Sequence, residues 1–192
     1  AAEACSFISN YANVGGGAIG SPSADSIYIN ECVFENDTAR NGKGGAIIHG
    51  GATTDEIVYI GNSQFRNNYS SVGGGAIHLF MNRTLIENCE ISDNMSGNSG
   101  GGVYLYYGNL EMNNCTIQKN FANSSESDGG GGIYNLSRLL LVDVDFLNNH
   151  TNGHGGAVNN SGSTSVLKAE NCSFLGNYAN VGGGAIGSPY AD

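Results

Sequence analysis

The sequence predicts an all-β protein, a right-handed, single-stranded parallel β-helix of about seven coils with 26–31 residues and three short strands in each coil. Three observations support this fold class. Two motifs recur together seven times, apolar and polar residues alternate with period 2 around them, and no segment keeps the 3.6-residue period of an amphipathic helix. A repeat period of this length is typical of a solenoid, in which each coil packs on its neighbours.

The first motif has the form GGAI, with Ala replaced by Gly or Ile by Val in some copies. Its paired glycines predict a corner where φ is positive or where a second backbone passes closely. The Ile or Val that follows is expected to return the chain to the core. The seven copies occupy residues 16–19, 44–47, 74–77, 100–103, 130–133, 155–158 and 183–186.

The second motif has the form C-x-F-x-x-N and defines three columns. We expect the first to hold small buried side chains, the second to fill the interior, and the third to form a ladder of side-chain amides. The columns are Cys5, Cys32, Ser63, Cys89, Cys115, Val144 and Cys172; then Phe7, Phe34, Phe65, Ile91, Ile117, Phe146 and Phe174; then Asn10, Asp37, Asn68, Asn94, Asn120, Asn149 and Asn177.

A further apolar strip precedes the second motif, five and three residues before the first column, as at Val58 and Ile60. Two mostly polar residues separate this strip from the column. With the strands of the two motifs it gives three strands in each coil. Coils stacked at the strand spacing of about 4.8 Å place equivalent residues on one another, and parallel crossovers predict right-handed winding.

With these paired GGAI and FxxN motifs, the sequence resembles the polymorphic outer-membrane-protein repeats of chlamydial autotransporter adhesins and of related adhesin-like microbial surface proteins. The resemblance extends coil by coil along the whole chain. It implies a β-helix that is displayed on the cell surface or secreted, and that serves in adhesion or as a stalk. We therefore expect an extracellular or cell-surface location and a structural or adhesive function without enzymatic activity.

Two segments of the chain are near copies of each other, which indicates that the coils are grouped into a larger repeat. Residues 1–25 and 168–192 are identical at 20 of 25 positions, at a separation of 167 residues. We interpret residues 1–192 as one solenoid segment that is uncapped at both ends. Residues 26–192 would be one block of six coils, with residues 1–25 from the preceding block. The chain would then be an excerpt of a very long tandem-repeat protein or filament.

The expected partners follow from this organisation and from the charge. The first partner is the protein itself, through end-to-end or tandem stacking of coils, and the others are surface glycans or receptors of host or neighbouring cells. A formal net charge of −10 argues against nucleic acid as a partner, because phosphates would be repelled. Membrane insertion by this segment is not expected, because no apolar run approaches 20 residues.

Two alternative functions remain open, a carbohydrate-active β-helix enzyme of the lyase or hydrolase kind and a receptor-binding adhesin passenger domain. Such enzymes need clustered carboxylates, whereas the acidic residues here are scattered, and Asp143 and Asp145 are expected to face solvent. We predict no catalytic, cofactor or metal site. The five cysteines are expected to be buried free thiols, with only Cys89 and Cys115 on neighbouring coils.

Ten N-x-S/T sequons occur in this Asn-rich chain. Those within the amide column would be blocked by burial. Four others are expected to lie in loops and to be the better acceptors for N-linked glycans, where the host has the machinery. These four are Asn82, Asn123, Asn135 and Asn159.

Overall fold

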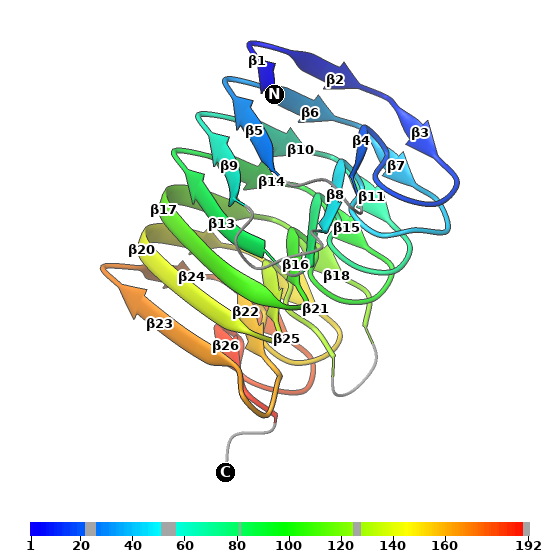
Figure 1. Cartoon of the computed structure of the whole chain (residues 1–192). Helices are drawn as coiled ribbons and strands as arrows, with labels where there is room; N and C mark the ends of the chain where they lie inside the picture. Colours follow the sequence, from blue (N-terminus) through cyan, green and yellow to red (C-terminus); the bar gives the residue numbers. More distant parts are fainter. Residues whose placement is uncertain (22–25, 51–56, 81, 125–127, 190–192) are drawn as a thin grey trace.

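The chain winds into a parallel β-solenoid of about six full turns (Figure 1). The computed structural model describes residues 1–21, 26–50, 57–80, 82–124 and 128–189, and it assigns no helix within those ranges. All strand pairs join one coil to the next and are parallel, as in Phe34↔Phe65 and Phe65↔Ile91. The all-β parallel β-helix expected from the sequence is confirmed.

The largest sheet has twelve strands and covers two adjoining faces of each coil (Figure 1). The first face, the apolar strip, contains β1 (Ala2–Glu3), β5 (Ile27–Asn30), β9 (Ile57–Gly61), β13 (Asn82–Glu87), β17 (Gly108–Gln118), β20 (Arg138–Leu147) and β23 (Val166–Glu170). The second face, the C-x-F strip, contains β2 (Ser6–Ile8), β6 (Val33–Glu35), β10 (Gln64–Arg66), β14 (Glu90–Ser92), β24 (Ser173–Leu175) and the second halves of β17 and β20.

The corner between these two faces is made by a residue in the left-handed conformation. The residue directly before the cysteine column has φ between 49° and 53° in all seven coils. Asn occupies four of these corners because its short polar side chain tolerates this conformation better than other non-glycine residues do. The corner residues are Ala4, Glu31, Asn62, Asn88, Asn114, Asp143 and Asn171.

A second sheet, of seven very short strands, follows the amide column. The sequence analysis did not predict it, because two residues are too few to show an alternating pattern. The coils therefore build three parallel sheets, and this sheet lies between the C-x-F strip and the GGAI corner. The strands are β3 (Tyr11–Ala12), β7 (Thr38–Ala39), β11 (Tyr69–Ser70), β15 (Met95–Ser96), β18 (Phe121–Ala122), β21 (His150–Thr151) and β25 (Tyr178–Ala179).

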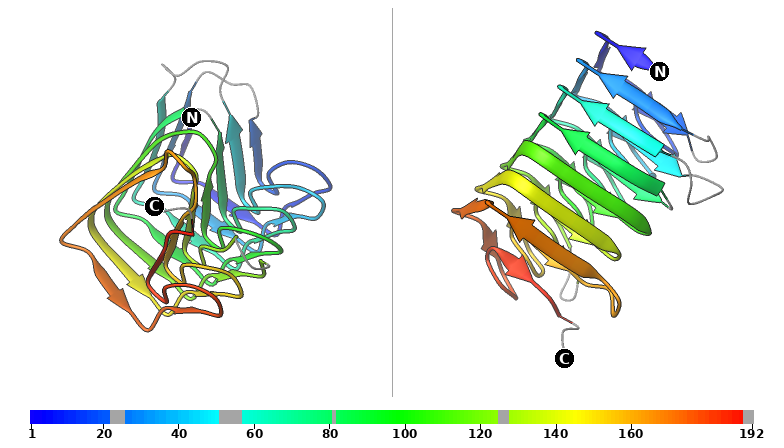
Figure 2. Two further views of the ribbon diagram at one scale, coloured as in Figure 1. Left: turned by 90° about the horizontal axis from the view of Figure 1, so that it is seen from below. Right: turned by 60° about the vertical axis from the view of Figure 1, so that its left-hand side comes forward.

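The third sheet begins at the Ile or Val of each GGAI motif. Viewed from below, the coils repeat one outline along the stack (Figure 2, left). The seven strands are β4 (Ile19–Ser21), β8 (Ile47–Gly50), β12 (Ile77–Phe80), β16 (Val103–Leu105), β19 (Ile133–Asn135), β22 (Val158–Asn160) and β26 (Ile186–Gly187).

The two glycines of the GGAI motif are required for different structural reasons. The first, as at Gly100, has a φ of 64° to 70° in the five inner coils. The second lies against the next coil: a Cβ on Gly101 would lie 2.2 Å from the carbonyl oxygen of Gly131. Because that atom belongs to the backbone, it cannot move aside as a flexible side chain can. The predicted corner, with positive φ and close backbone approach, is confirmed at these positions.

The Phe and Ile column forms one continuous file through the interior. Consecutive members are direct register partners from Phe7 to Phe174. The rings of Phe34 and Phe65 are stacked with centroids 4.7 Å apart and an interplanar angle of 1°. The five inner members of the file are fully buried. Strand spacing thus sets the ring spacing, and the interior is a stack of like side chains.

The amide column forms a hydrogen-bonded ladder along the stack. In Asn94, Nδ2 donates to Oδ1 of Asn120 at 3.0 Å and to the carbonyl of Phe65 at 2.9 Å. The backbone N–H of Asn94 donates to the same Oδ1 of Asn120 at 3.0 Å. Asn68, Asn120 and Asn149 make the same set of bonds. Each amide therefore fixes its own corner and links it to the next coil.

Asp37 occupies one step of this ladder with a carboxylate. Its Oδ1 accepts from the backbone N–H and from Nδ2 of Asn10, both at 2.8 Å. Its Oδ2 is buried with no hydrogen-bond partner among the described residues. At the other steps Nδ2 of Asn occupies this place and donates. Burial raises the pKa of Asp37, and the hydrogen bonds from Asn10 oppose that rise.

Replacing Asp37 by Asn is expected to stabilise the protein at neutral pH. The Nδ2 of Asn can donate two hydrogen bonds at the place where Asp37 Oδ2 has no donor. Two such bonds contribute about 1–2 kcal/mol to the free energy of unfolding. Because the folded state raises this pKa above the ordinary 3.8, the wild type loses stability as pH rises through the folded-state value. The gain from Asp37→Asn should therefore be small at pH 3.5 and full at pH 7. Urea unfolding of both proteins at the two pH values measures it, and an equal gain at both would contradict this account.

Candidate binding groove

The cysteine column lies at the first corner, and its side chains make hydrogen bonds there. Cys32 Sγ donates to the carbonyl of Asn30 at 3.1 Å, and Ser63 Oγ donates to that of Gly61 at 2.6 Å. Ser63 Oγ also accepts from the backbone N–H of Cys32 at 3.0 Å. The column therefore satisfies backbone groups at a corner as well as packing there. That explains why Ser can replace Cys.

All five cysteines are free thiols. Cys32, Cys89 and Cys115 are buried, as expected, whereas Cys5 and Cys172 are partly buried. The expectation that only Cys89 and Cys115 are neighbours is wrong. Cys5 and Cys32 also occupy consecutive coils, and the backbone nitrogen of Cys5 lies 3.4 Å from Cys32 Sγ.

The electrostatics of Cys32 and Cys89 do not favour reactivity. Burial raises the pKa of Cys32, and a hydrogen bond with Cys115 together with burial raises that of Cys89, whereas the same hydrogen bond lowers the pKa of Cys115. A thiol with a raised pKa is a poor nucleophile and a poor metal ligand. Within the described ranges, no group of three or more His, Cys, Asp or Glu side chains could hold a metal ion.

The structure separates the four candidate glycan acceptors. Asn123 is exposed and its Oδ1 accepts from Nδ2 of Asn152 at 2.8 Å. Asn135 and Asn159 are fully buried in β19 and β22, so these two do not lie in loops as expected. Asn135 is buried because it alternates with the inward Ile133 and pairs in register with the buried Leu105, so it faces the interior, where its Nδ2 donates to Oδ1 of Asn160 at 2.7 Å. The side chain of Asn82 lies outside the described residues.

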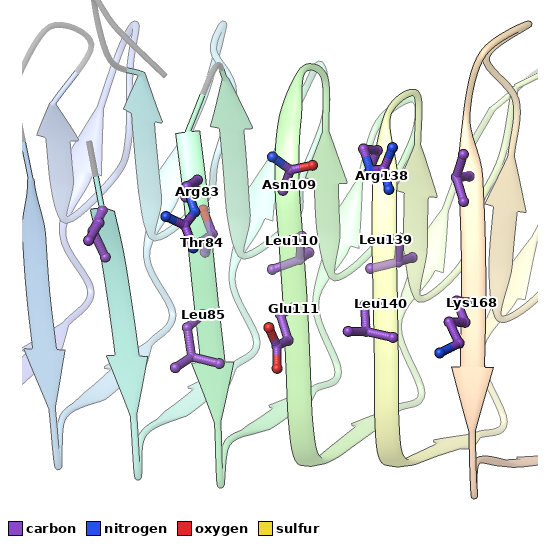
Figure 3. A pocket seen from close by; sticks show the side chains of 12 residues that line it. Arg83, Thr84, Leu85, Asn109, Leu110, Glu111, Arg138, Leu139, Leu140 and Lys168 are labelled. Carbon is purple, nitrogen blue, oxygen red and sulfur yellow. The ribbon is translucent and has the colours of Figure 1, made fainter. Parts of the chain in front are cut away.

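A groove of about 550 Å³ lies on the first face, across β13, β17 and β20 (Figure 3). Figure 2 (right) shows this face turned toward the viewer, with its strands side by side. Period-2 alternation sends one set of side chains out from each strand, and Thr84, Leu110 and Leu139 point to the core, where they are buried. The outward residues that line the groove are Ile57, Arg83, Leu85, Asn109, Glu111, Arg138, Leu140, Val166 and Lys168.

The strand register arranges these residues in two rows that run along the solenoid axis. The upper row reads Ile57, Arg83, Asn109, Arg138 and Val166. The lower row reads Tyr59, Leu85, Glu111, Leu140 and Lys168. Strands β13 and β20 thus each present an Arg above a Leu, and β17 between them presents Asn109 above Glu111 (Figure 3).

The groove gathers positive charge on an acidic protein. It holds three of the seven Lys and Arg residues in a chain whose formal net charge is −10. Within the described part of the chain, salt bridges join Arg66 to Glu35 and Lys168 to Glu170, and none involves Arg83 or Arg138. Both arginines are exposed, so their guanidinium groups are available to an anion.

Glu111 introduces one negative charge at the centre of the groove. One of its oxygens, Oε1, accepts from Nδ2 of Asn113 at 3.1 Å, and the residue is exposed. The arrangement can therefore bind anions at two places and accept hydrogen bonds between them. It also offers apolar contacts through Leu85 and Leu140 of the lower row, both half-buried.

The sequence analysis did not identify this groove. The signal was present, because Arg83, Asn109 and Arg138 each lie one residue before an expected inward position in consecutive repeat lines. Aligning the outward positions of the apolar strip would have placed the two arginines in one row. No residue type recurs in every coil of this row, so it does not appear as a column of the repeat.

Two segments of the chain match a known repeat. The family model of the Chlamydia polymorphic membrane protein repeat matches residues 62–79 and 171–189. Both segments include the cysteine-column corner, a Phe of the interior file and the GGAI motif, so the resemblance seen in the sequence is confirmed there. Comparison with curated proteins and with solved structures gave no match. Among the described residues, no helix has the length and hydrophobicity required to cross a bilayer.

Proposed function

Because two of its coils match the repeat of the chlamydial polymorphic membrane proteins, we propose that this chain is part of an extracellular, adhesin-like surface protein. In this proposal the solenoid is a rigid stalk that holds binding surfaces along its sides, and it catalyses no reaction. The observation that carries the proposal is the match of the family repeat to the residues that build the continuous core.

The ladders support the mechanical part of the proposal. Phe stacking in the interior and amide bonding at the corner both run from coil to coil, so bending the rod would separate many contacts together. A solenoid gains its stability from such nearest-neighbour contacts. Tandem copies of a 167-residue block would lengthen the rod and repeat each side surface, which suits multivalent binding.

The groove supports binding without cleavage. Glycoside hydrolysis commonly requires two carboxyl groups on either side of the scissile bond. Glu111 is the single carboxylate among the described residues that line the groove. We therefore propose that a bound glycan is held there and not cut.

Adhesion tests the proposal directly. Beads coated with the 192-residue chain should attach to cultured epithelial cells more strongly than albumin-coated beads, and free folded chain should compete. The matched control is the same chain unfolded in urea and alkylated before coating. Attachment equal to that of the control beads would contradict the adhesive function, and small-angle scattering would separately test the rod shape.

A further inference from the structure

We propose that the groove across β13, β17 and β20 binds a linear acidic polysaccharide in which a carboxylate-bearing sugar alternates with a neutral sugar. This inference names the partner class of the adhesive function proposed above and rests on it for biological meaning. The binding itself is a property of the groove and can be measured without cells. The chain of the polysaccharide would run along the solenoid axis, parallel to the two rows of side chains.

The spacing of the arginines carries the first step. Arg83 and Arg138 are register partners of the same residue, Asn109, from opposite sides. They are therefore two coils apart, which is about 10 Å at the ordinary strand spacing. A guanidinium group presents a planar fork that matches a carboxylate with two parallel hydrogen bonds. Two such forks at this spacing favour a polymer whose negative charges recur at intervals of two coils.

The residues on the strand between the two arginines are the second observation that supports this ligand. Asn109 and Glu111 on β17 present an amide and a carboxylate where the polymer passes from one charge to the next. Glu111 would repel a third anion at that place, but it can accept a hydrogen bond from a hydroxyl group. A neutral sugar with free hydroxyls meets both requirements. Along the upper row the order is positive, neutral and positive, and Glu111 adds a negative charge beside the neutral place in the lower row, an arrangement that favours an alternating polymer.

Apolar side chains beside the arginines are the third observation that supports this ligand. Leu85 and Leu140 lie on the same outward face, two residues further along the strands that carry the two arginines, and Ile57 and Val166 extend the apolar surface beyond the arginines. Ile57 and Val166 are 53% and 45% exposed, so this surface is open to a ligand. Sugar rings carry apolar C–H faces that can cover it, and burying apolar surface adds favourable free energy to the charge contacts.

Two other acidic polymers fit the groove less well. Double-stranded DNA carries about one charge per 1.7 Å of axis, so Glu111 would face a phosphate whatever the register. An acidic peptide adds to a sheet most effectively through its backbone, at an open strand edge. Strands β13, β17 and β20 are paired on both sides, so this face offers a peptide side chains alone.

Hyaluronate is the probe for the experiment, because its repeating unit joins one glucuronate to one N-acetylglucosamine. We expect a fluorescently labelled hyaluronate decamer to bind the 192-residue chain with saturation and to bind more weakly as salt rises from 25 to 150 mM. The double change Arg83→Gln with Arg138→Gln should weaken binding about 5- to 30-fold, the sum of two exposed charge contacts.

The matched control is the double change Arg40→Gln with Lys119→Gln. It removes the same two positive charges from exposed positions outside the groove, so the net charge of the two variants is equal. Binding by the control should stay within about twofold of the wild type. Thermal unfolding of both variants should match the wild type, which excludes loss of structure as the cause.

Three results would overturn the proposal. The first is that hyaluronate does not bind at millimolar concentration, and the second is that the groove and control variants bind it equally. In the third, poly-L-glutamate or single-stranded poly(dT) binds more tightly than hyaluronate and loses affinity in the groove variant, which would assign the groove to an acidic peptide or a nucleic acid. Neutral dextran should not bind. If hyaluronate binding fails these tests while beads coated with the chain still adhere to cells, the polysaccharide ligand is refuted and the adhesive function is not.

Discussion

Replacing Phe65 by Ala is expected to lower the free energy of unfolding by about 3–5 kcal/mol, the usual cost of removing a buried aromatic ring. Phe65 is fully buried, stacked on Phe34 at 4.7 Å and in register with Ile91 on the other side. The cavity would open between two coils whose backbones are held at the strand spacing. The surroundings therefore cannot close around it by moving one helix or loop.

Chemical denaturation of the wild type and Phe65→Ala measures this loss. Phe65→Leu is the matched control, because it keeps most of the apolar volume and should cost less than about 1.5 kcal/mol. The unfolding of a solenoid can lose its two-state character when one coil is weakened. A transition that broadens or splits in Phe65→Ala would show that the stack breaks at this coil, whereas equal losses in both variants would contradict the ring-stacking account.

Much of the fold could be predicted from residue columns, because in a solenoid the residues that contact one another occupy equivalent positions of successive repeats. Phe34, Phe65 and Ile91 are about 30 residues apart, yet the repeat aligns them, and the structure places them in one file. The same reasoning located the corner at Gly100 and Gly101, since two glycines in every line indicate a backbone constraint and not a side-chain function.

The features that the sequence did not predict depend on residues that do not recur at equivalent positions of the repeat. The two-residue strands such as Tyr69–Ser70 are too short for a periodic signal. Asn135 faces the interior because the third sheet continues two residues beyond Ile133, and a polar residue at that place gave no sequence signal of burial. The groove depends on Arg83 and Arg138, which share a row with Asn109 and form no motif.

This contrast has a physical basis that bears on function. Interior columns are constrained in every coil, because each side chain must fit the copies above and below it. Outward residues on the first face are less tightly packed against the equivalent residues of neighbouring coils. They can therefore differ from coil to coil at small cost in stability. Binding specificity in this fold is therefore expected in the departures from the repeat, and the repeat itself supplies the spacing between binding groups.

Replacing Asn120 by Ala is the second substitution expected to have a large effect, with a loss of about 2–5 kcal/mol in the free energy of unfolding. Asn120 is fully buried in the amide ladder. Its Oδ1 accepts from the backbone N–H and the Nδ2 of Asn94, and its Nδ2 donates to the carbonyl of Ile91 and to Oδ1 of Asn149. Alanine removes all four bonds and takes the acceptor from the backbone N–H of Asn94 in a place that water does not reach.

Asn152→Ala is the matched control, because Asn152 belongs to a second amide ladder at the surface. Its Nδ2 donates to Asn123 at 2.8 Å and its Oδ1 accepts from Asn180 at 3.0 Å, and both bonds are exposed. Water can replace these partners, so the loss should stay below about 1 kcal/mol. Urea unfolding of the two variants compares one amide ladder inside the solenoid with another outside it. Equal losses would mean that burial does not set the strength of the ladder, and the rigidity proposed for the stalk would then have to come from the stacked Phe and Ile side chains alone.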